Sequence, residues 1–134
     1  MINNLIDIMQ KEKNALENLL LLLEKQHKSI VNKEVLKLHG IVDEIKLANR
    51  DVATQEVARR KILNGKKVKD IINESDNKEL DRTYRDIKMV LESIRLQNET
   101  NELLVKQQLI FANKMLSIIN PRREVGTYNA CGRL

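Results

Sequence analysis

Histidine, cysteine and paired carboxylates most often carry catalysis or metal binding, and this sequence has few of them. His27 and His39 lie on two different predicted helices, and neither has a cysteine or a carboxylate pair at ligand spacing. Cys131 is the only cysteine, so no disulfide can form within the chain. Asp43 and Glu44 are adjacent, so on a helix they point in different directions. We expect no enzymatic activity, no cofactor and no metal, with both histidines solvated.

A cluster of basic residues between positions 59 and 69 could contact an anionic partner. It surrounds the predicted end of a helix, where the helix dipole favours cations, and it lacks aromatic residues that could stack on bases. We therefore expect no nucleic-acid partner. A solvated helix end and a weak site for an acidic partner stay open as interpretations. The cluster consists of Arg59, Arg60, Lys61, Lys66, Lys67 and Lys69.

The composition indicates that long helices position these residues. The chain has 134 residues, which is one domain, with 2% aromatic residues, 4 Gly and 1 Pro. So few turn formers and aromatics argue against sandwiches, barrels and wound sheets, whereas 32% charged residues suit elongated helices. We predict an all-α fold: an antiparallel three-helix coiled-coil bundle.

No secretion signal or membrane span is evident in the sequence. Asn3, Asn4 and Asp7 stand where a basic signal region would lie, and the longest apolar run, Leu19 to Leu23, is far too short to span a bilayer. We therefore expect a cytoplasmic protein without membrane insertion.

Hydrophobic periodicity predicts helices at about 3–30, 33–64 and 77–120, forming one elongated domain over residues 1–120. A short helix is possible between 66 and 75. The remaining residues, 121–134, have no periodicity and are expected to form a flexible tail.

Particular residues are expected to mark the helix ends. Asn32 and Asp76 are candidate caps of the second and last helices, and Asn64-Gly65 is a candidate terminator. The first helix has an apolar heptad stripe, widened by five consecutive leucines, so it could contact two neighbours at once.

The second half of the last helix, residues 96–119, carries the most apolar surface. It contains neither Gly nor Pro, and Pro121 closes it. At ~100° per residue, its apolar side chains cover an arc of roughly 180°, whereas packing one face needs only ~100°. We call this set the apolar arc: Leu104, Val105, Leu109, Phe111, Ala112, Met115, Leu116, Ile118 and Ile119.

Two interpretations of the apolar arc stay open. The other two helices could both pack on the last helix, which would then organise the bundle and bury most of the arc. Alternatively, the arc could capture an amphipathic helix of a partner protein. The second interpretation fits best the residues away from the middle of the arc, namely Phe111 and Ile118, together with Leu103 and Ile110 just outside it.

Two short motifs accompany these helices. The last helix contains Asn101-Glu102-Leu103-Leu104, and the tail contains Tyr128-Asn129-Ala130-Cys131-Gly132. With the Leu-rich first helix and the segment Ile30 to Val35 that opens the second, the chain resembles the flagellar export chaperones of the FlgN family over nearly its whole length. The tail motif is similar to the Tyr-x-x-x-Gly pattern of that family, although this sequence stops soon after Gly132, where relatives often continue.

The resemblance implies a chaperone that binds hook-filament junction (hook-associated) proteins before their export. It would keep their terminal helices from self-associating and deliver them to the export gate of the flagellar type III apparatus. By position, client binding would fall on Leu104, Phe111, Met115 and Ile118, and docking to the cytoplasmic domain of the gate on Tyr128.

Two other classes of function stay open. A structural or adaptor coiled coil could form a homodimer through the last helix. A nucleic-acid-binding module would instead depend steeply on salt through the basic cluster.

Overall fold

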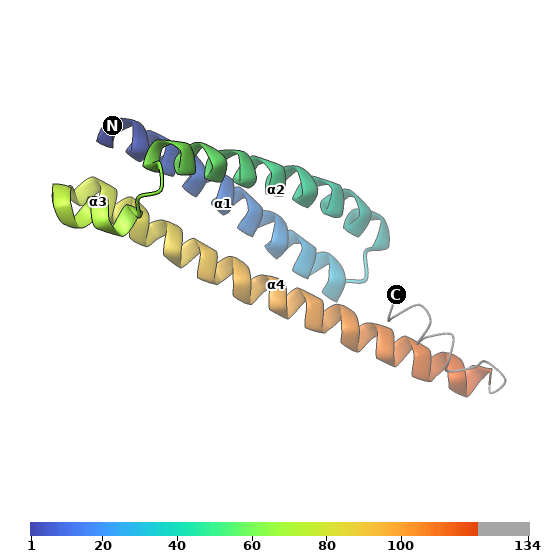
Figure 1. Ribbon diagram of the computed structural model, residues 1–134. Coiled ribbons are helices and arrows are strands. Elements are labelled where there is room, and N and C mark those ends of the chain that lie inside the picture. Colours follow the sequence, from blue (N-terminus) through green and yellow to red (C-terminus); the bar gives the residue numbers. More distant parts are fainter. Residues whose placement is uncertain (121–134) are drawn as a thin grey trace.

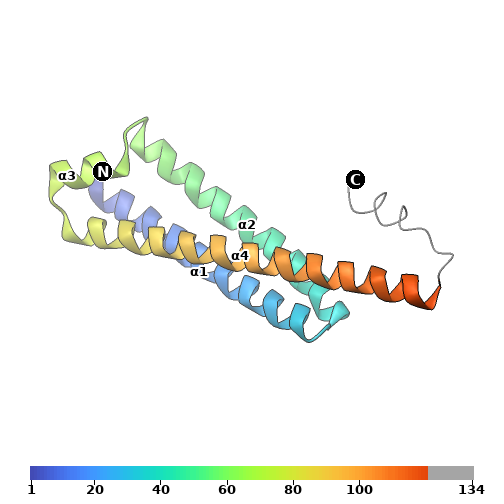
Figure 2. The same cartoon turned by 90° about the horizontal axis from the view of Figure 1, so that it is seen from below.

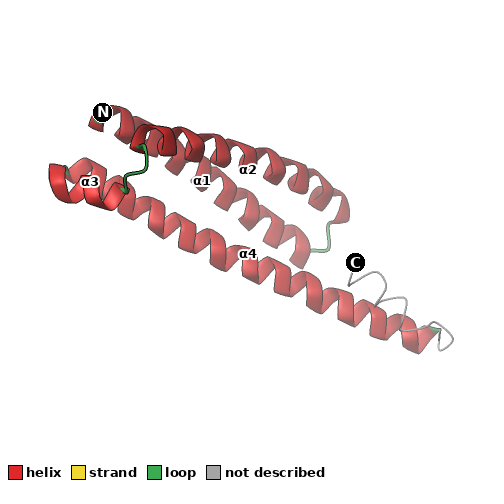
Figure 3. Ribbon diagram, viewed as in Figure 1, coloured by secondary structure: helices red, strands yellow, loops and turns green. Residues whose placement is uncertain are grey.

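The computed structural model describes residues 1–120, which form four helices and contain no strand (Figures 1 and 3). They are α1 (Ile2–Val31), α2 (Val35–Leu63), the short α3 (Val68–Ser75) and α4 (Lys78–Ile119). The predicted all-α class is confirmed. The division into a domain over residues 1–120 and a tail over residues 121–134 stays a prediction, because the tail lies outside the described residues.

Local backbone chemistry explains where α2 ends. Asn64 and Gly65 both take left-handed conformations, with φ values of 48° and 87°, which ends the helix at the predicted terminator. The two other predicted caps are wrong. Asn32 follows α1 as its C-cap rather than opening α2, and Asp76 is the left-handed C-cap of α3. The next residue, Asn77, caps α4 because its side chain accepts a hydrogen bond from the Leu80 backbone N–H at 3.0 Å.

The central helix is α1. It packs along both α2 and α4, whereas α2 and α4 make little close backbone contact with each other (Figures 1 and 2). Glu12, in the first half of α1, pairs with Arg59 near the end of α2, so these two helices run antiparallel. Gln10 of α1 donates a hydrogen bond to Thr83 of α4, and further along both helices the Leu23 carbonyl accepts one from Asn101. α4 therefore runs parallel to α1.

This arrangement differs from the prediction. The antiparallel three-helix bundle is not confirmed in that form, because a fourth, short helix (α3) is present and α2 and α4 make little close contact with each other, although the directions of the three long helices are those of such a bundle. The last helix does not organise the fold either. The widened leucine stripe of α1 does contact two neighbours, as expected, and that stripe makes α1 the centre.

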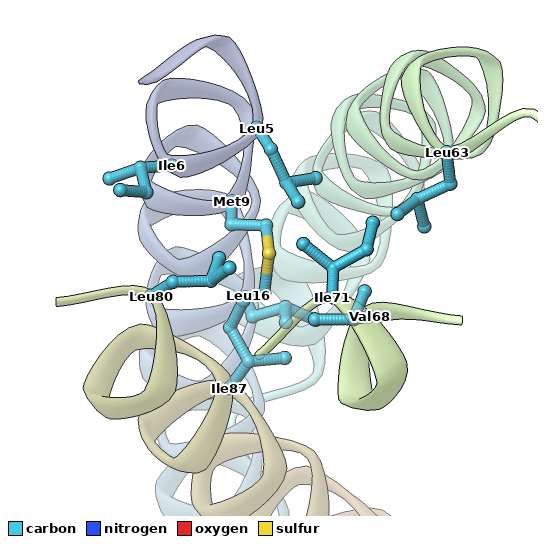
Figure 4. Packing of buried hydrophobic residues seen from close by; sticks show 9 residues of the cluster. All are labelled: Leu5, Ile6, Met9, Leu16, Leu63, Val68, Ile71, Leu80 and Ile87. Carbon is cyan, nitrogen blue, oxygen red and sulfur yellow. The ribbon is translucent and has the colours of Figure 1, made fainter. Parts of the chain in front are cut away.

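The main core lies where the start of α1, the end of α2, α3 and the start of α4 come together (Figure 4). Leu5 and Leu80 have 0% exposure, and Ile71 of α3 points toward Met9 of α1. The same cluster includes Ile6, Leu16, Leu63, Val68 and Ile87. A second, smaller cluster follows along α1 and α2: Leu19, Leu22, Leu23 and Ala48. Apolar burial therefore concentrates near the α3 end of the molecule.

Candidate protein-binding surface

The end of α4 projects beyond the helix on which it packs. The Gln108 Nε2 donates a hydrogen bond to the Ile30 carbonyl at 2.9 Å, next to the last residue of α1. Residues 109–119 lie beyond this bond and form about three further turns. Both views show α4 continuing past the connection between α1 and α2 (Figures 1 and 2).

No residue of α4 after Asn101 is buried, although the sequence there stays strongly apolar. We call residues 102–119 the distal segment. Phe111 is 61% exposed and Ile118 is 73% exposed. The other large exposed apolar residues of the distal segment are Leu103, Val105, Leu109, Ile110, Met115, Leu116 and Ile119. The interpretation in which the other helices cover the apolar arc is therefore wrong for the chain by itself.

Four of the five predicted site residues lie in the distal segment. Leu104 is partly buried, while Phe111, Met115 and Ile118 are exposed. Their spacings of seven, four and three residues place them along one side of the helix. Their roles stay predictions. The fifth residue, Tyr128, lies outside the described residues.

A buried amide marks the boundary between the packed part of α4 and the distal segment. Asn101 is 3% exposed, and its Nδ2 donates to the Leu23 carbonyl at 2.9 Å and to Gln26 Oε1 at 3.0 Å. Its Oδ1 accepts from Gln97 Nε2 at 3.0 Å. Asn101 and Gln108 together join α4 to the end of α1 through hydrogen bonds. Asn98, three residues earlier on α4, is exposed.

A partly buried ion pair lies between α1 and α2. Glu12 is 6% exposed and its Oε1 lies 3.1 Å from the Arg59 Nε, although that N–H is not aimed well enough to form a hydrogen bond. Burial raises the pKa of Glu12 above its usual value, and Arg59 offsets part of this rise. Sequence reasoning did not predict this pair. The signal was available, because Glu12 and Gln26 are the two polar positions in the heptad stripe of α1.

Residues 1–120 contain no group of three or more His, Cys, Asp or Glu side chains that could hold a metal ion. Within the same range, no helix has the length and apolar character needed to cross a membrane.

The fold and this surface define an all-α protein in which a central helix supports a long helix with an exposed apolar end. The family model described as "FlgN protein" matches residues 1–134, so the chain belongs to the FlgN family. The family resemblance noted in the sequence is thus confirmed: this is a FlgN-family flagellar export chaperone. No curated protein and no solved structure matches the chain.

Proposed function

We propose that the protein acts in the cytoplasm and holds the terminal amphipathic helices of hook-filament junction proteins against the distal segment of α4. The single observation that supports this most strongly is the exposure of the apolar distal segment in a chain that belongs to the FlgN family. Phe111, Met115 and Ile118 would contact the client directly, and Leu104 would contact it just beyond the end of the packed part of α4.

The chemistry of the distal segment suits the capture of a helix. An unassembled filament-type subunit exposes an amphipathic helix whose apolar face would otherwise self-associate. Covering that face with a second apolar helix removes both surfaces from water, which stabilises the complex without any catalytic group. An affinity nearer micromolar than picomolar would hold the client and still allow its release.

Delivery is a separate part of the proposal. Tyr128 would dock to the cytoplasmic domain of the export gate, and the client would remain on α4 until then. Because the two roles fall on different parts of the chain, Tyr128→Ala should leave client binding unchanged and impair delivery. Loss of client binding in this variant would contradict the proposed division of roles.

The test is size-exclusion chromatography with light scattering, using the carboxyl-terminal helical segment of a hook-filament junction protein from the same organism. The unaltered protein should form a one-to-one complex. Phe111→Asp and Ile118→Asp should each weaken binding at least ~tenfold, because a charge would be buried in the apolar contact. Leu36→Asp is the matched control, since Leu36 is 88% exposed on a different helix.

The control should bind the segment as the unaltered protein does, and all three variants should keep their helicity. Equal binding by Phe111→Asp, Ile118→Asp and Leu36→Asp would refute the distal segment as the client site.

A second candidate function rests on the same exposed face. A structural or adaptor coiled coil would cover the distal segment with a second copy of itself. Light scattering separates the two functions, because a homodimer that persists in the presence of the client segment would favour self-association.

A further inference from the structure

A basic hollow lies at the opposite end of the molecule from the distal segment. It is an open surface depression with a volume of about 540 Å³. It opens at the corner where α2 ends and α3 begins, and it is lined mainly by Arg59, Arg60, Leu63, Lys66, Val68 and Tyr84. Lys67 and Lys69 complete its basic rim.

The sequence concentrates positive charge at this corner. From residue 57 to residue 69 the chain contains six basic residues and no Asp or Glu. The left-handed turn at Asn64 and Gly65 brings the end of α2 and the start of α3 around one corner, so basic residues from both sides face the same space. The result is a local positive field that the net charge of +5 alone would not produce.

Only part of this charge is neutralised within the described residues. Arg59 faces Glu12 at 3.1 Å, and Arg60 pairs with Glu56 at 2.6 Å. No carboxylate among residues 1–120 lies within ion-pair distance of Lys66, Lys67 or Lys69, and all three are exposed. Three uncompensated lysines at the mouth of a hollow favour an anionic occupant.

We infer that this hollow binds an acidic peptide segment of a partner protein. Asp or Glu side chains would pair with Lys66, Lys67 and Lys69, and small apolar groups of the same segment would contact Leu63, Val68 and Tyr84. A nucleic acid fits less well. Among residues 1–120, Tyr84 is the only aromatic side chain at the hollow, and Lys88 Nζ already lies 4.9 Å from the centre of its ring.

The hollow and the distal segment are far enough apart to be occupied together. Tyr84 and Phe111 both lie on α4, and the 27 residue steps from one to the other correspond to ~40 Å of helix. An acidic partner at the hollow would therefore not compete directly with a client helix. The inference does not depend on the identity of the client.

The experiment uses the full chain and a fluorescein-labelled synthetic peptide of alternating Glu and Ala, followed by fluorescence anisotropy. The corresponding Gln-Ala peptide measures binding that is independent of charge. The triple variant Lys66→Gln/Lys67→Gln/Lys69→Gln should bind the acidic peptide about tenfold more weakly, because each exposed ion pair contributes modestly. All three positions are exposed, so the variant should remain folded.

The matched control is Lys25→Gln/Lys28→Gln/Lys46→Gln, which removes the same charge from exposed positions elsewhere. It should bind the acidic peptide as the unaltered protein does. Equal weakening in both triple variants would overturn the inference, because it would show only a general charge effect. A single-stranded oligonucleotide of the same charge that binds more tightly than the peptide, and loses binding in the first variant, would also overturn it.

Discussion

The two halves of α4 are parts of one uninterrupted helix, yet they lie in opposite environments. Residues 78–101 include Leu80, Thr83, Ile87 and Asn101, all buried against the rest of the molecule. The distal segment, residues 102–119, contains no buried residue and exposes nine large apolar side chains. Apolar sequence alone therefore does not decide burial. The decisive difference is the length of the neighbouring helix. α1 ends at Val31, close to Gln108, so residues 109–119 extend past the end of α1.

We propose that α4 divides folding and recognition between these two parts. The first half contributes apolar burial to the free energy of folding, while the second half keeps its apolar surface available. If the separation is real, substitutions in the two halves should act on different measurements. Matched substitutions in the two parts of α4 distinguish these measurements.

Leu80→Ala should lower the free energy of unfolding by about 2–5 kcal/mol, because Leu80 is fully buried and its removal leaves a cavity. Leu103→Ala is the matched change in the distal segment, where Leu103 is 56% exposed, and it should change stability by less than about 0.5 kcal/mol. Urea denaturation followed by circular dichroism measures both. Comparable losses in the two variants would mean that the distal segment is packed in solution.

Asn101→Ala tests the boundary between the halves. It removes the hydrogen bonds from Asn101 to the Leu23 carbonyl and Gln26, and leaves Gln97 without its acceptor. We expect a loss of about 1–2 kcal/mol in the free energy of unfolding. Asn98→Ala should be neutral or slightly stabilising, because Asn98 is exposed and Ala is the better helix former.

The two substitutions should also differ in their effect on the distal segment. In hydrogen exchange, amides of the distal segment should exchange faster in Asn101→Ala than in Asn98→Ala, since the buried amide helps to hold α4 to α1. Identical exchange in the two variants would show that the boundary lies elsewhere.

Much of the fold follows from signals that are local in the sequence. The helices follow from hydrophobic periodicity, and the end of α2 follows from Asn64-Gly65, whose left-handed conformations the backbone shows. The cap of α4 was misplaced by one residue, because Asp76 and Asn77 are both good cap formers and only the backbone distinguishes them. Local chemistry thus predicts that one helix ends and the next begins near these residues. It does not decide which of the two adjacent residues caps the new helix.

The arrangement of the helices did not follow from the sequence. The apolar arc of the last helix is broad enough to suggest the central helix of a bundle, yet α1 takes that place. Periodicity gives the width of an apolar face, whereas burial depends on the relative lengths and register of the neighbouring helices. For the same reason, the sequence left the choice open between a packed arc and an exposed one. The polar heptad positions Glu12 and Gln26 were the overlooked sign of register, because both find polar partners across the seams.

The smallest predicted effect concerns pH and is confined to the packed part of the molecule. The folded state raises the pKa of Glu12 above its usual 4.5, mainly through burial. The folded protein then binds the proton more tightly than the unfolded chain, so ionisation of Glu12 costs stability. This loss of stability begins as the pH rises past the pKa of Glu12 in the unfolded chain. It is complete once the pH is above the pKa of Glu12 in the folded protein. Glu12→Gln should abolish this contribution, since it cannot ionise.

The measurement is the urea midpoint of the unaltered protein and of Glu12→Gln, from below pH 4.5 upward. Hydrogen bonds from Lys37 and Arg95 lower the pKa values of Glu34 and Glu92, so these exposed carboxylates change stability with pH in the opposite direction. Subtracting the midpoint of Glu12→Gln from that of the unaltered protein cancels their contribution. The stability of the unaltered protein relative to Glu12→Gln should fall as pH rises. Client binding should be equal in the two proteins across this range, because Glu12 lies near the start of α1 and the distal segment begins beyond Asn101. A rising difference in stability would mean that Arg59 outweighs burial. A difference in client binding would show that the packing between α1 and α2 is coupled to the distal segment.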